Sequence, residues 1–252
     1  MNIVVPIKVL ADDQDIVVAA DRSLDDSKAH RIVSAYDLNA LETAAQLASA
    51  HDGSKVVAVS VADAKADDSK LKKGVLARGV DELAMIADDA CADLDAHATA
   101  AVLAQLIAAQ GAFDLVVCGD GSADNYAQQV DVQLADALGL PVVTAVSSVS
   151  VEGGVATCDR MLESQIQTVQ VDLPAVVSVV PDAASPRIPG MKDILAAGKK
   201  PSAVGKAESI PPAAIEVAET KAPEQAERKQ EVLDASVEGA IETFAAALKA
   251  AL

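Results

Sequence analysis

The chain has 252 residues, which is enough to bury one substantial core together with an extension. Its 38 Asp and Glu against 20 Lys and Arg give a formal net charge of −18, a balance that repels nucleic acid and anionic membrane surfaces. With two Tyr, two Phe and no Trp, few rings are available to stack on a base or a flavin.

The cysteines and the apolar runs indicate the compartment. Cys91, Cys118 and Cys158 are widely spaced in apolar surroundings, which is typical of buried thiols under reducing conditions, and they have no metal-ligand spacing. The N-terminal stretch lacks the basic flank of a signal peptide, and no apolar run reaches membrane-spanning length. We therefore expect a cytoplasmic protein.

Residues 1–61 begin with a buried strand. Residues 2–10 are apolar, and the acid-rich residues 11–30 predict a polar loop or small hairpin. An amphipathic helix follows from Asp37, its expected N-cap, to Gly53, and residues 55–61 form the second strand.

The alternation of helix and strand then repeats. Helices are expected over residues 64–78 and 95–109, and strands over 82–87 and 114–118. Such alternation predicts right-handed βαβ units. The expected fold is a doubly wound, mostly parallel, Rossmann-like α/β sheet of the kind that binds adenine nucleotides, with a C-terminal arm and helix.

The pattern changes after Pro141. Four β-rich segments, residues 142–150, 155–161, 165–171 and 175–180, are expected to extend the sheet as hairpins. A short helix is expected around Ile194.

The C-terminal part is expected to lie outside the core. Residues 1–201 form the predicted α/β domain, and residues 202–230 are rich in Ala, Pro, Glu and Lys without a core pattern. Within residues 237–252, one helical face carries Ile241, Phe244, Ala245, Leu248 and Leu252. Docking of this helix on a partner and docking on its own domain both remain open.

The most informative stretch runs from Asp114 to Val130. A buried strand, a loop with Gly119 and Gly121, and a helix ending at Gly139 succeed one another. In open α/β sheets such a loop and helix start can face a phosphate. The alternative is an ordinary capped βα loop, because neither GxGxxG nor GxxxxGK[ST] occurs.

No residue pattern indicates catalysis by the chain itself. His30, His51 and His97 lie in unrelated segments, and no Ser or Cys sits in a GxSxG elbow. From the residues alone we expect a nucleotide-binding α/β subunit with an interaction arm and no metal site.

Several stretches together resemble the β subunit of electron transfer flavoproteins, and their residues and spacing are most similar to the FixA-like branch that includes carnitine-linked proteins. The match as a whole covers nearly the entire chain in order. These stretches are Ser34–Glu42, Cys118–Gln129, Leu173–Val179 and Pro186–Pro201.

The resemblance implies a heterodimer whose α subunit holds most of the redox FAD, while the β subunit binds AMP or, in electron-bifurcating members, a second FAD. It also implies an electron carrier rather than an enzyme, with an acyl-CoA dehydrogenase or reductase as redox partner. Residues 202–252, the arm and C-terminal helix, are expected to contact the α subunit, and the net charge of −18 leaves no nucleic acid or membrane partner. The implied nucleotide-binding residues are Pro6, Ser34, Ala35, Tyr36, Asp37, Val61, Gly119, Asp120, Gly121, Ser122, Ala123, Asp124, Asn125, Tyr126, Ala127, Gln128, Gln129 and Val130.

By the same matching, residues 186–196 resemble the loop that docks acyl-CoA dehydrogenases. Pro189, Gly190, Met191 and Lys192 are the implied contacts, with Met191 as the apolar anchor. Two other functions remain open: an NADH-oxidising bifurcating component with two FAD, and a universal-stress-like nucleotide-binding regulator without a redox role.

Overall fold

The computed structural model describes residues 1–224 and 230–251. These residues form two compact units. The first combines residues 1–17 with 25–219, and the second combines residues 18–24 with the described residues from 220 onward.

The first unit is built on a nine-stranded sheet with the order β11-β10-β9-β12-β8-β1-β6-β7-β13. All neighbours pair in parallel except β9–β10 and β10–β11. The doubly wound, mostly parallel fold is therefore confirmed. The strands are β1 (Asn2–Pro6), β6 (Lys55–Ala62), β7 (Glu82–Ala87), β8 (Leu115–Gly119), β9 (Val142–Glu152), β10 (Val155–Met161), β11 (Ile166–Asp172), β12 (Ala175–Val179) and β13 (Ser202–Gly205).

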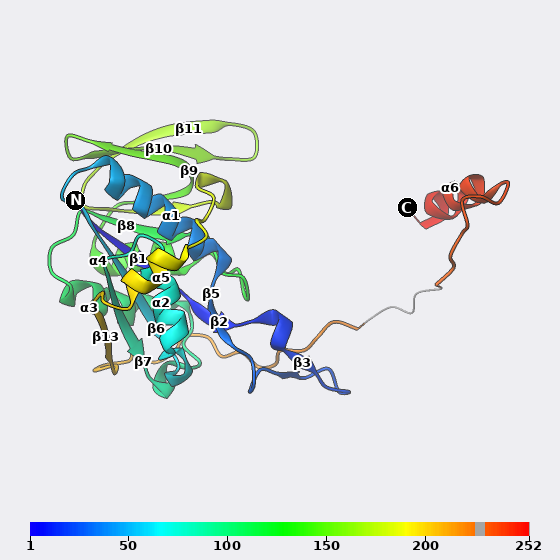
Figure 1. The fold of residues 1–252 in the computed structure, drawn as a ribbon, viewed down its shortest axis with the longest axis horizontal. Helices are drawn as coiled ribbons and strands as arrows, with labels where there is room; N and C mark the ends of the chain where they lie inside the picture. Colours follow the sequence, from blue (N-terminus) through cyan, green and yellow to red (C-terminus); the bar gives the residue numbers. More distant parts are fainter. Residues whose placement is uncertain (225–229, 252) are drawn as a thin grey trace. The chain divides into compact units, whose positions relative to one another are not determined.

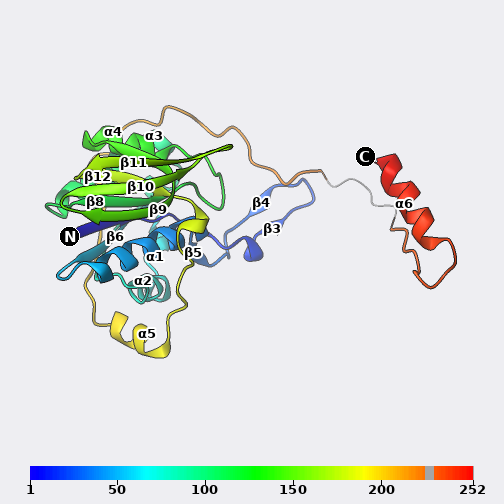
Figure 2. The ribbon, with the colours of Figure 1, turned by 90° about the horizontal axis from the view of Figure 1, so that it is seen from above.

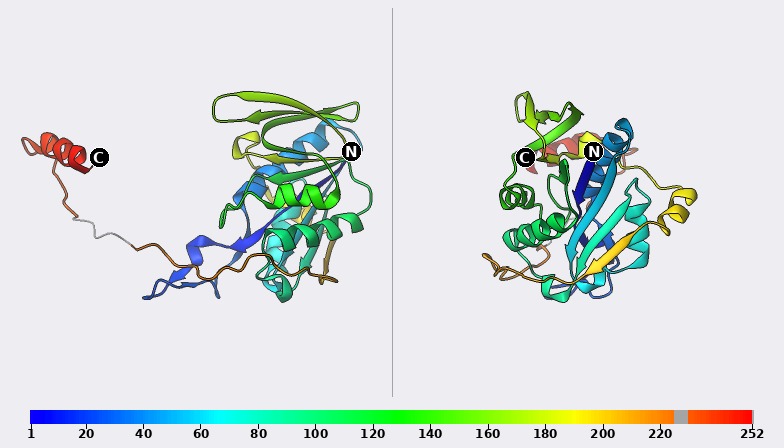
Figure 3. Two further views of the ribbon diagram at one scale, coloured as in Figure 1. Left: turned by 180° about the vertical axis from the view of Figure 1, so that it is seen from behind. Right: turned by 90° about the vertical axis from the view of Figure 1, so that its left-hand side faces the viewer.

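Helices cover both faces of this sheet (Figures 1 and 2). One face carries α1 (Ala35–Ala50), α2 (Ser69–Leu76) and α5 (Met191–Ala197), and the other carries α3 (Ala96–Ala109) and α4 (Val130–Leu138). The right-hand view of Figure 3 shows α3 and α4 on the opposite side of the strands from α5. Two large apolar clusters fill the two interfaces. No helix within the described residues is long and apolar enough to cross a membrane.

Short elements complete the chain. Near the N-terminus, β2 (Val9–Ala11) pairs antiparallel with β5 (Arg31–Val33), and β3 (Val17–Val18) pairs with β4 (Leu24–Asp25). Single 3-10 turns span Asp13–Asp15 (η1), Ala64–Ala66 (η2), Asp89–Cys91 (η3) and Pro181–Ala183 (η4). The hairpin expected within residues 11–30 is confirmed by β3 and β4.

The helix expected over residues 64–78 is confirmed for its second part only, because its first part is a separate turn. A single 3-10 turn, η2, comes first, and α2 begins only at Ser69. Asp68 explains the break, since its side chain accepts hydrogen bonds from the amides of Lys70 and Leu71 and caps a new helix. A side chain that binds amides two and three residues later competes with continuation of the helix.

The expectation that all four β-rich segments extend the sheet as hairpins is also wrong for the last one. Strands β9, β10 and β11 form two hairpins, but β12 returns to lie between β8 and β9, parallel to both. All five residues of β12 are buried, whereas β11 alternates between exposed and half-buried positions. A strand buried on both faces belongs in the sheet interior, and an alternating strand belongs at an edge.

Residues 202–215 are tied to the first unit. Strand β13 pairs with β7 and forms the edge of the sheet, and Ile210 packs beside Cys91 and Val102. Farther along, the Asp95 carboxylate accepts hydrogen bonds from the amides of Ala214 and Ile215. Backbone pairing, apolar packing and a carboxylate cap thus hold this stretch.

The second unit pairs the β3–β4 hairpin tip with the chain after residue 220. Ser23 forms an isolated antiparallel β-bridge with Lys221, and the Ala222 amide donates a hydrogen bond to the Arg22 carbonyl at 2.9 Å. The helix α6 spans Ala240–Ala251 and exposes Ile241, Phe244 and Leu248, which share one helical face. Leu252 lies outside the described residues.

These contacts distinguish two possible domain boundaries, after residue 201 and after Glu219. A chain ending at Glu219 keeps β13 and should melt cooperatively at the wild-type temperature. A chain ending at Pro201 exposes the backbone of β7 and should melt at a lower temperature. Thermal unfolding followed by circular dichroism measures both, and equal melting temperatures for the two truncated chains would place the boundary at 201.

Candidate functional site

The strand order reverses beside β1, where the chain first builds outward through β6 and β7 and then returns through β8 on the other side. In doubly wound sheets this reversal opens a crevice at the carboxyl ends of the two strands. Lys8 follows β1 at this point, the loop from Asp120 follows β8, and Ser34 precedes α1. The reversal therefore brings three distant segments together.

Asp37 joins these segments. Its carboxylate accepts a hydrogen bond from the Lys8 amide at 2.7 Å and another from the Gly119 amide, and the residue is only 6% exposed. The expectation that Asp37 caps α1 is wrong, because Ser34 occupies the cap position and Asp37 lies in the first turn. Its carboxylate links the ends of β1 and β8 instead.

Burial dominates the ionisation of Asp37. It raises the pKa of this carboxyl to about 7, against the lowering effect of the amides of Lys8 and Gly119. The charged form therefore predominates only above neutral pH. The carboxyl also lies against Gly119, where a Cβ would be 2.8 Å from Asp37 Oδ1. Glycine at 119 thus allows the close approach of strand and helix.

The only two tyrosines of the chain meet at this site. The ring centroids of Tyr36 and Tyr126 are 5.1 Å apart, and Tyr126 is 44% exposed. A Cβ at Gly121 would be 2.3 Å from Tyr126 Cδ2, so glycine makes room for this ring. Composition alone suggested that rings are scarce, but the fold gathers both tyrosines at one place. They form an aromatic platform suited to a planar base.

Asp120 contacts the hydroxyl group of Tyr126, one of the two platform rings. Its Oδ2 accepts a hydrogen bond from Tyr126 Oη at 3.2 Å, and its buried Oδ1 has no hydrogen-bond partner among the described residues. Burial raises the pKa of this carboxyl, and the Tyr126 hydroxyl opposes that shift. Asp120 therefore holds the hydroxyl of Tyr126 in position.

Lys8 supplies a positive charge that the sequence analysis did not assign to the site. Its Nζ lies 2.6 Å from Asp124 Oδ2 and 3.5 Å from Ser122 Oγ. The Ala123 amide donates to Ser34 Oγ at 3.3 Å, so the loop is tied to both β1 and α1. The position of Lys8 just after the first strand is the sequence feature from which its place in the site could have been predicted.

The start of α4 completes the donor set. Gln129 occupies its N-cap position but makes no side-chain capping bond. The N–H groups in the first turn of this nine-residue helix are therefore not capped by that side chain and can donate hydrogen bonds to a ligand. Amide donors, one lysine, an aromatic platform and carboxylate acceptors fit a nucleotide whose phosphate is bound mainly by backbone. Asp37, Asp120, Asp124 and Asp131 disfavour additional phosphate charge.

The other implied nucleotide-binding residues lie at the ends of β1 and β6, in the loop after β8 and at the starts of α1 and α4. Pro6 ends β1 in a buried position, and the exposed loop includes Asn125, Ala127, Gln128 and Gln129. Ala35 and Val130 begin α1 and α4. Val61 lies near the carboxyl end of β6, where it packs against the apolar cluster beneath α3 and α4 and against a smaller cluster of Ile86, Cys91 and Val102.

A separate groove of about 510 Å³ opens at the amino ends of the strands and includes His51, Val151 and Asp114. His51 Nδ1 lies 2.8 Å from the Leu47 carbonyl, and its Nε2 lies 2.9 Å from the Val151 carbonyl. These two acceptors raise the pKa of the imidazole. His51 is thus a tie between α1 and β9, with neither ring nitrogen free for chemistry.

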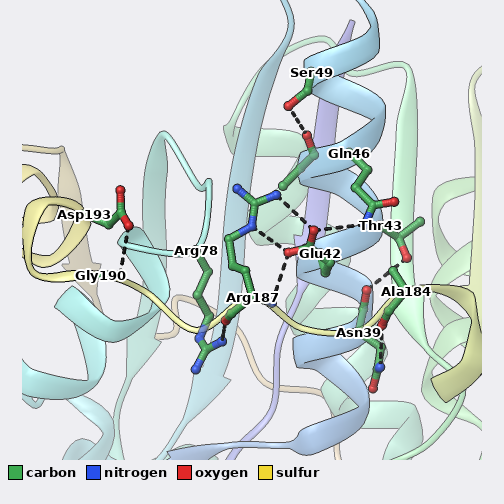
Figure 4. Close-up of polar contacts among 11 residues, drawn as sticks. Asn39, Glu42, Thr43, Gln46, Ser49, Arg78, Ala184, Arg187, Gly190 and Asp193 are labelled. Atoms are coloured by element: carbon green, nitrogen blue, oxygen red, sulfur yellow. Dashed lines mark hydrogen bonds and ion pairs between the residues drawn. The ribbon is translucent and has the colours of Figure 1, made fainter.

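Residues 181–200 form an anchored surface segment (Figure 4). Asn39 Nδ2 donates to the carbonyls of Pro181 and Ala184, both at 2.8 Å, and Arg187 pairs with Glu42. Beyond these anchors the side chains of Ile188 and Met191 are 95% and 75% exposed, and Ile194 and Leu195 are exposed as well. The implied docking contacts Pro189, Gly190 and Lys192 lie in the same segment.

The fold is that of a doubly wound α/β protein, and its candidate ligand site lies at the strand-order reversal. The family model described as the electron transfer flavoprotein domain matches residues 21–231. The chain belongs to the electron transfer flavoprotein family.

The raised pKa of Asp37 predicts a specific pH dependence of stability. Between its unfolded value of about 3.8 and the folded value of about 7, the folded protein binds more protons than the unfolded chain. The stability that this group contributes is therefore complete below about pH 4 and is lost as the pH rises to about 7. Asp37→Asn removes the titration.

Urea unfolding of the wild type and of Asp37→Asn across this pH range measures the effect. The difference in unfolding free energy, wild type minus variant, should be largest at the acid end and reach a plateau above about pH 7. A difference that stays constant or grows with pH would contradict the buried, proton-binding state.

Proposed function

We propose that this chain is the β subunit of a heterodimeric electron transfer flavoprotein of the FixA-like, carnitine-linked branch, working in the cytoplasm. It passes electrons to or from an acyl-CoA dehydrogenase or reductase through FAD held mainly by an α subunit. The observation that carries the proposal is the convergence of Lys8, the start of α1 and the loop from Gly119 at the strand-order reversal.

The chain's own residues bind and orient in this proposal. The amides of the 120–130 loop and of α4 bind the phosphate of AMP, and Tyr126 stacks on its base. The FAD supplies the electron-transfer chemistry when bound, so this subunit needs neither a nucleophile nor a general base. The side chains around the crevice, among them Lys8, Asp124 and Tyr126, are suited to binding and orienting a ligand, which supports this division of labour.

A second FAD in place of AMP is the alternative ligand, and it would accompany NADH oxidation by a bifurcating complex. The aromatic platform favours a planar ring system and accepts either adenine-containing ligand. A nucleotide-binding regulator without redox function is the third possibility. Nucleotide analysis of the co-purified complex separates them: one FAD and one AMP, two FAD, or no flavin.

We predict that Gly121→Val lowers the nucleotide content of the complex. The valine side chain takes the place of the Tyr126 ring, which a Cβ would approach to 2.3 Å, and moves the platform. Gly205→Val in β13 is the matched control, because a Cβ there meets nothing within 4 Å. Bound AMP is quantified by chromatography after denaturation. Equal nucleotide content in the two variants would refute this role of the loop.

We further propose that residues 186–196 dock the dehydrogenase. Ile188 and Met191 are apolar side chains held in solvent on an anchored segment, the arrangement of an interface anchor. The sequence analysis identified Met191 as the anchor, and the greater exposure of Ile188 adds a second. The partner chemistry that fits is an apolar pocket with a polar rim.

Met191→Ala and Ile188→Ala should weaken docking without changing the complex itself. Truncating a central anchor commonly costs about 2 kcal/mol, which corresponds to roughly a 30-fold higher dehydrogenase concentration at half-maximal electron transfer. Ile166→Ala is the control, since Ile166 is an exposed isoleucine on β11. Reduction of the dehydrogenase by pre-reduced complex is followed over a range of its concentrations. Unchanged kinetics in both loop variants would rule out docking by this loop.

We also propose that the described chain after residue 220 contacts the α subunit. The exposed face of α6, formed by Ile241, Phe244 and Leu248, supports this assignment. The chain ending at Glu219 should therefore stay folded yet fail to co-purify with the α subunit.

A further inference from the structure

The proposed docking loop depends on a buried carboxylate in the middle of α1. Glu42 is only 7% exposed, and both of its oxygens face Arg187. Arg187 Nε donates to Oε2 at 2.6 Å, Nη2 donates to Oε1 at 3.1 Å, and the Arg187 amide donates to Oε2 at 3.2 Å. Gln46 donates to Oε1 at 3.0 Å. The pair is bidentate, the geometry that fixes both partners in orientation as well as in distance.

Other contacts hold the backbone of Arg187. The guanidinium Nη1 of Arg78 donates to the Arg187 carbonyl at 2.5 Å. Gly79, at φ +86°, leaves space for the Arg187 side chain, because a Cβ there would be 3.1 Å from Arg187 Nη1. Arg187 immediately precedes Ile188, so its backbone sets the direction in which the exposed apolar segment leaves the domain.

The far end of the segment is held in a similar way. Lys200 Nζ donates to the carbonyls of Leu76 and Val80 at 3.0 and 2.6 Å. Residues 188–199, with all four exposed apolar side chains, thus span two polar anchors on α1 and on the end of α2. An interface segment fixed before binding loses less conformational entropy when it binds.

The Glu42–Arg187 pair differs from the ion pairs on the surface. Lys55 and Glu82, 2.7 Å apart, have side chains that are 44% and 36% exposed, a setting in which an ion pair contributes little. Although burial pushes the pKa of Glu42 upward, hydrogen bonds from Arg187 and Gln46 outweigh it and hold that pKa below its usual value. Glu42 is therefore charged at neutral pH.

We infer that Glu42 and Arg187 are positioning residues that pre-order the part of the docking loop after Arg187, residues 188–196, for its protein partner. The inference rests on the proposed docking function and assigns no chemistry to either residue. Loss of the ion pair keeps the apolar anchors Ile188 and Met191 in the loop but no longer fixes their position. The partner then binds more weakly, while electron transfer within the bound complex keeps its rate.

The test uses the co-purified complex and two readouts. Glu42→Gln removes the charge, and Arg187→Lys keeps the charge but loses the bidentate geometry. The first readout is trypsin cleavage after Lys192, followed by mass spectrometry. We expect it to be about tenfold faster in both variants, equivalent to about 1.4 kcal/mol of local opening free energy. The second is the dehydrogenase concentration at half-maximal electron transfer, expected to rise about tenfold with the maximal rate and flavin content unchanged.

Glu82→Gln is the matched control, because it makes the same chemical change in an exposed ion pair, and neither readout should move. Unchanged trypsin cleavage in Arg187→Lys would overturn the anchoring. Faster cleavage with unchanged half-saturation, in an assay where Met191→Ala does raise it, would overturn the positioning role while leaving docking intact. If Met191→Ala and Ile188→Ala also leave half-saturation unchanged, the docking function fails and the positioning role falls with it.

Discussion

The buried polar side chains of α1 are the constraint on which the rest of the structure depends. Asp37, Asn39 and Glu42 are each less than a tenth exposed, so each must find hydrogen-bond partners within the protein. Asp37 finds them at the ends of β1 and β8, Asn39 in the carbonyls of Pro181 and Ala184, and Glu42 in Arg187. One helix thereby holds the crevice at its start and the exposed apolar segment along its side.

Charge shapes what the crevice is able to bind. The chain carries a net charge of −18, and Lys8 is the cation that the described contacts place in the crevice, already paired with Asp124. An anion held there must rely on backbone amides, which remain donors at every pH and need no counter-charge. The acidic surroundings act against highly charged phosphates. A nucleotide with a single phosphate group suits this balance better than a triphosphate.

The crevice and the exposed apolar segment differ in their physical design. The crevice is polar, lies at the carboxyl ends of strands, and gathers residues from three distant segments. The segment after Arg187 is apolar and exposed, and it owes its order to polar anchors at both ends. Both regions are tied to rigid elements by polar side chains, which limits the freedom of their residues before a ligand or partner binds. A family whose members hand electrons between proteins has use for both.

The alternation of strands and helices could be predicted from the sequence, because apolar periodicity and the helix-end signals at Gly139 and Asp95 are local. The loop after Cys118 could be located in the same way, since glycines that follow a buried strand require a turn. Four features are visible only in the folded chain: β12 inserts beside β8, β13 extends the sheet, Tyr36 meets Tyr126, and Arg187 pairs with Glu42 across 145 positions. A helix position with a buried acid looks the same as one with a solvated acid until its distant partner is known. Long-range polar pairing depends on which surfaces the whole chain brings together, and no local pattern in one sequence carries that information.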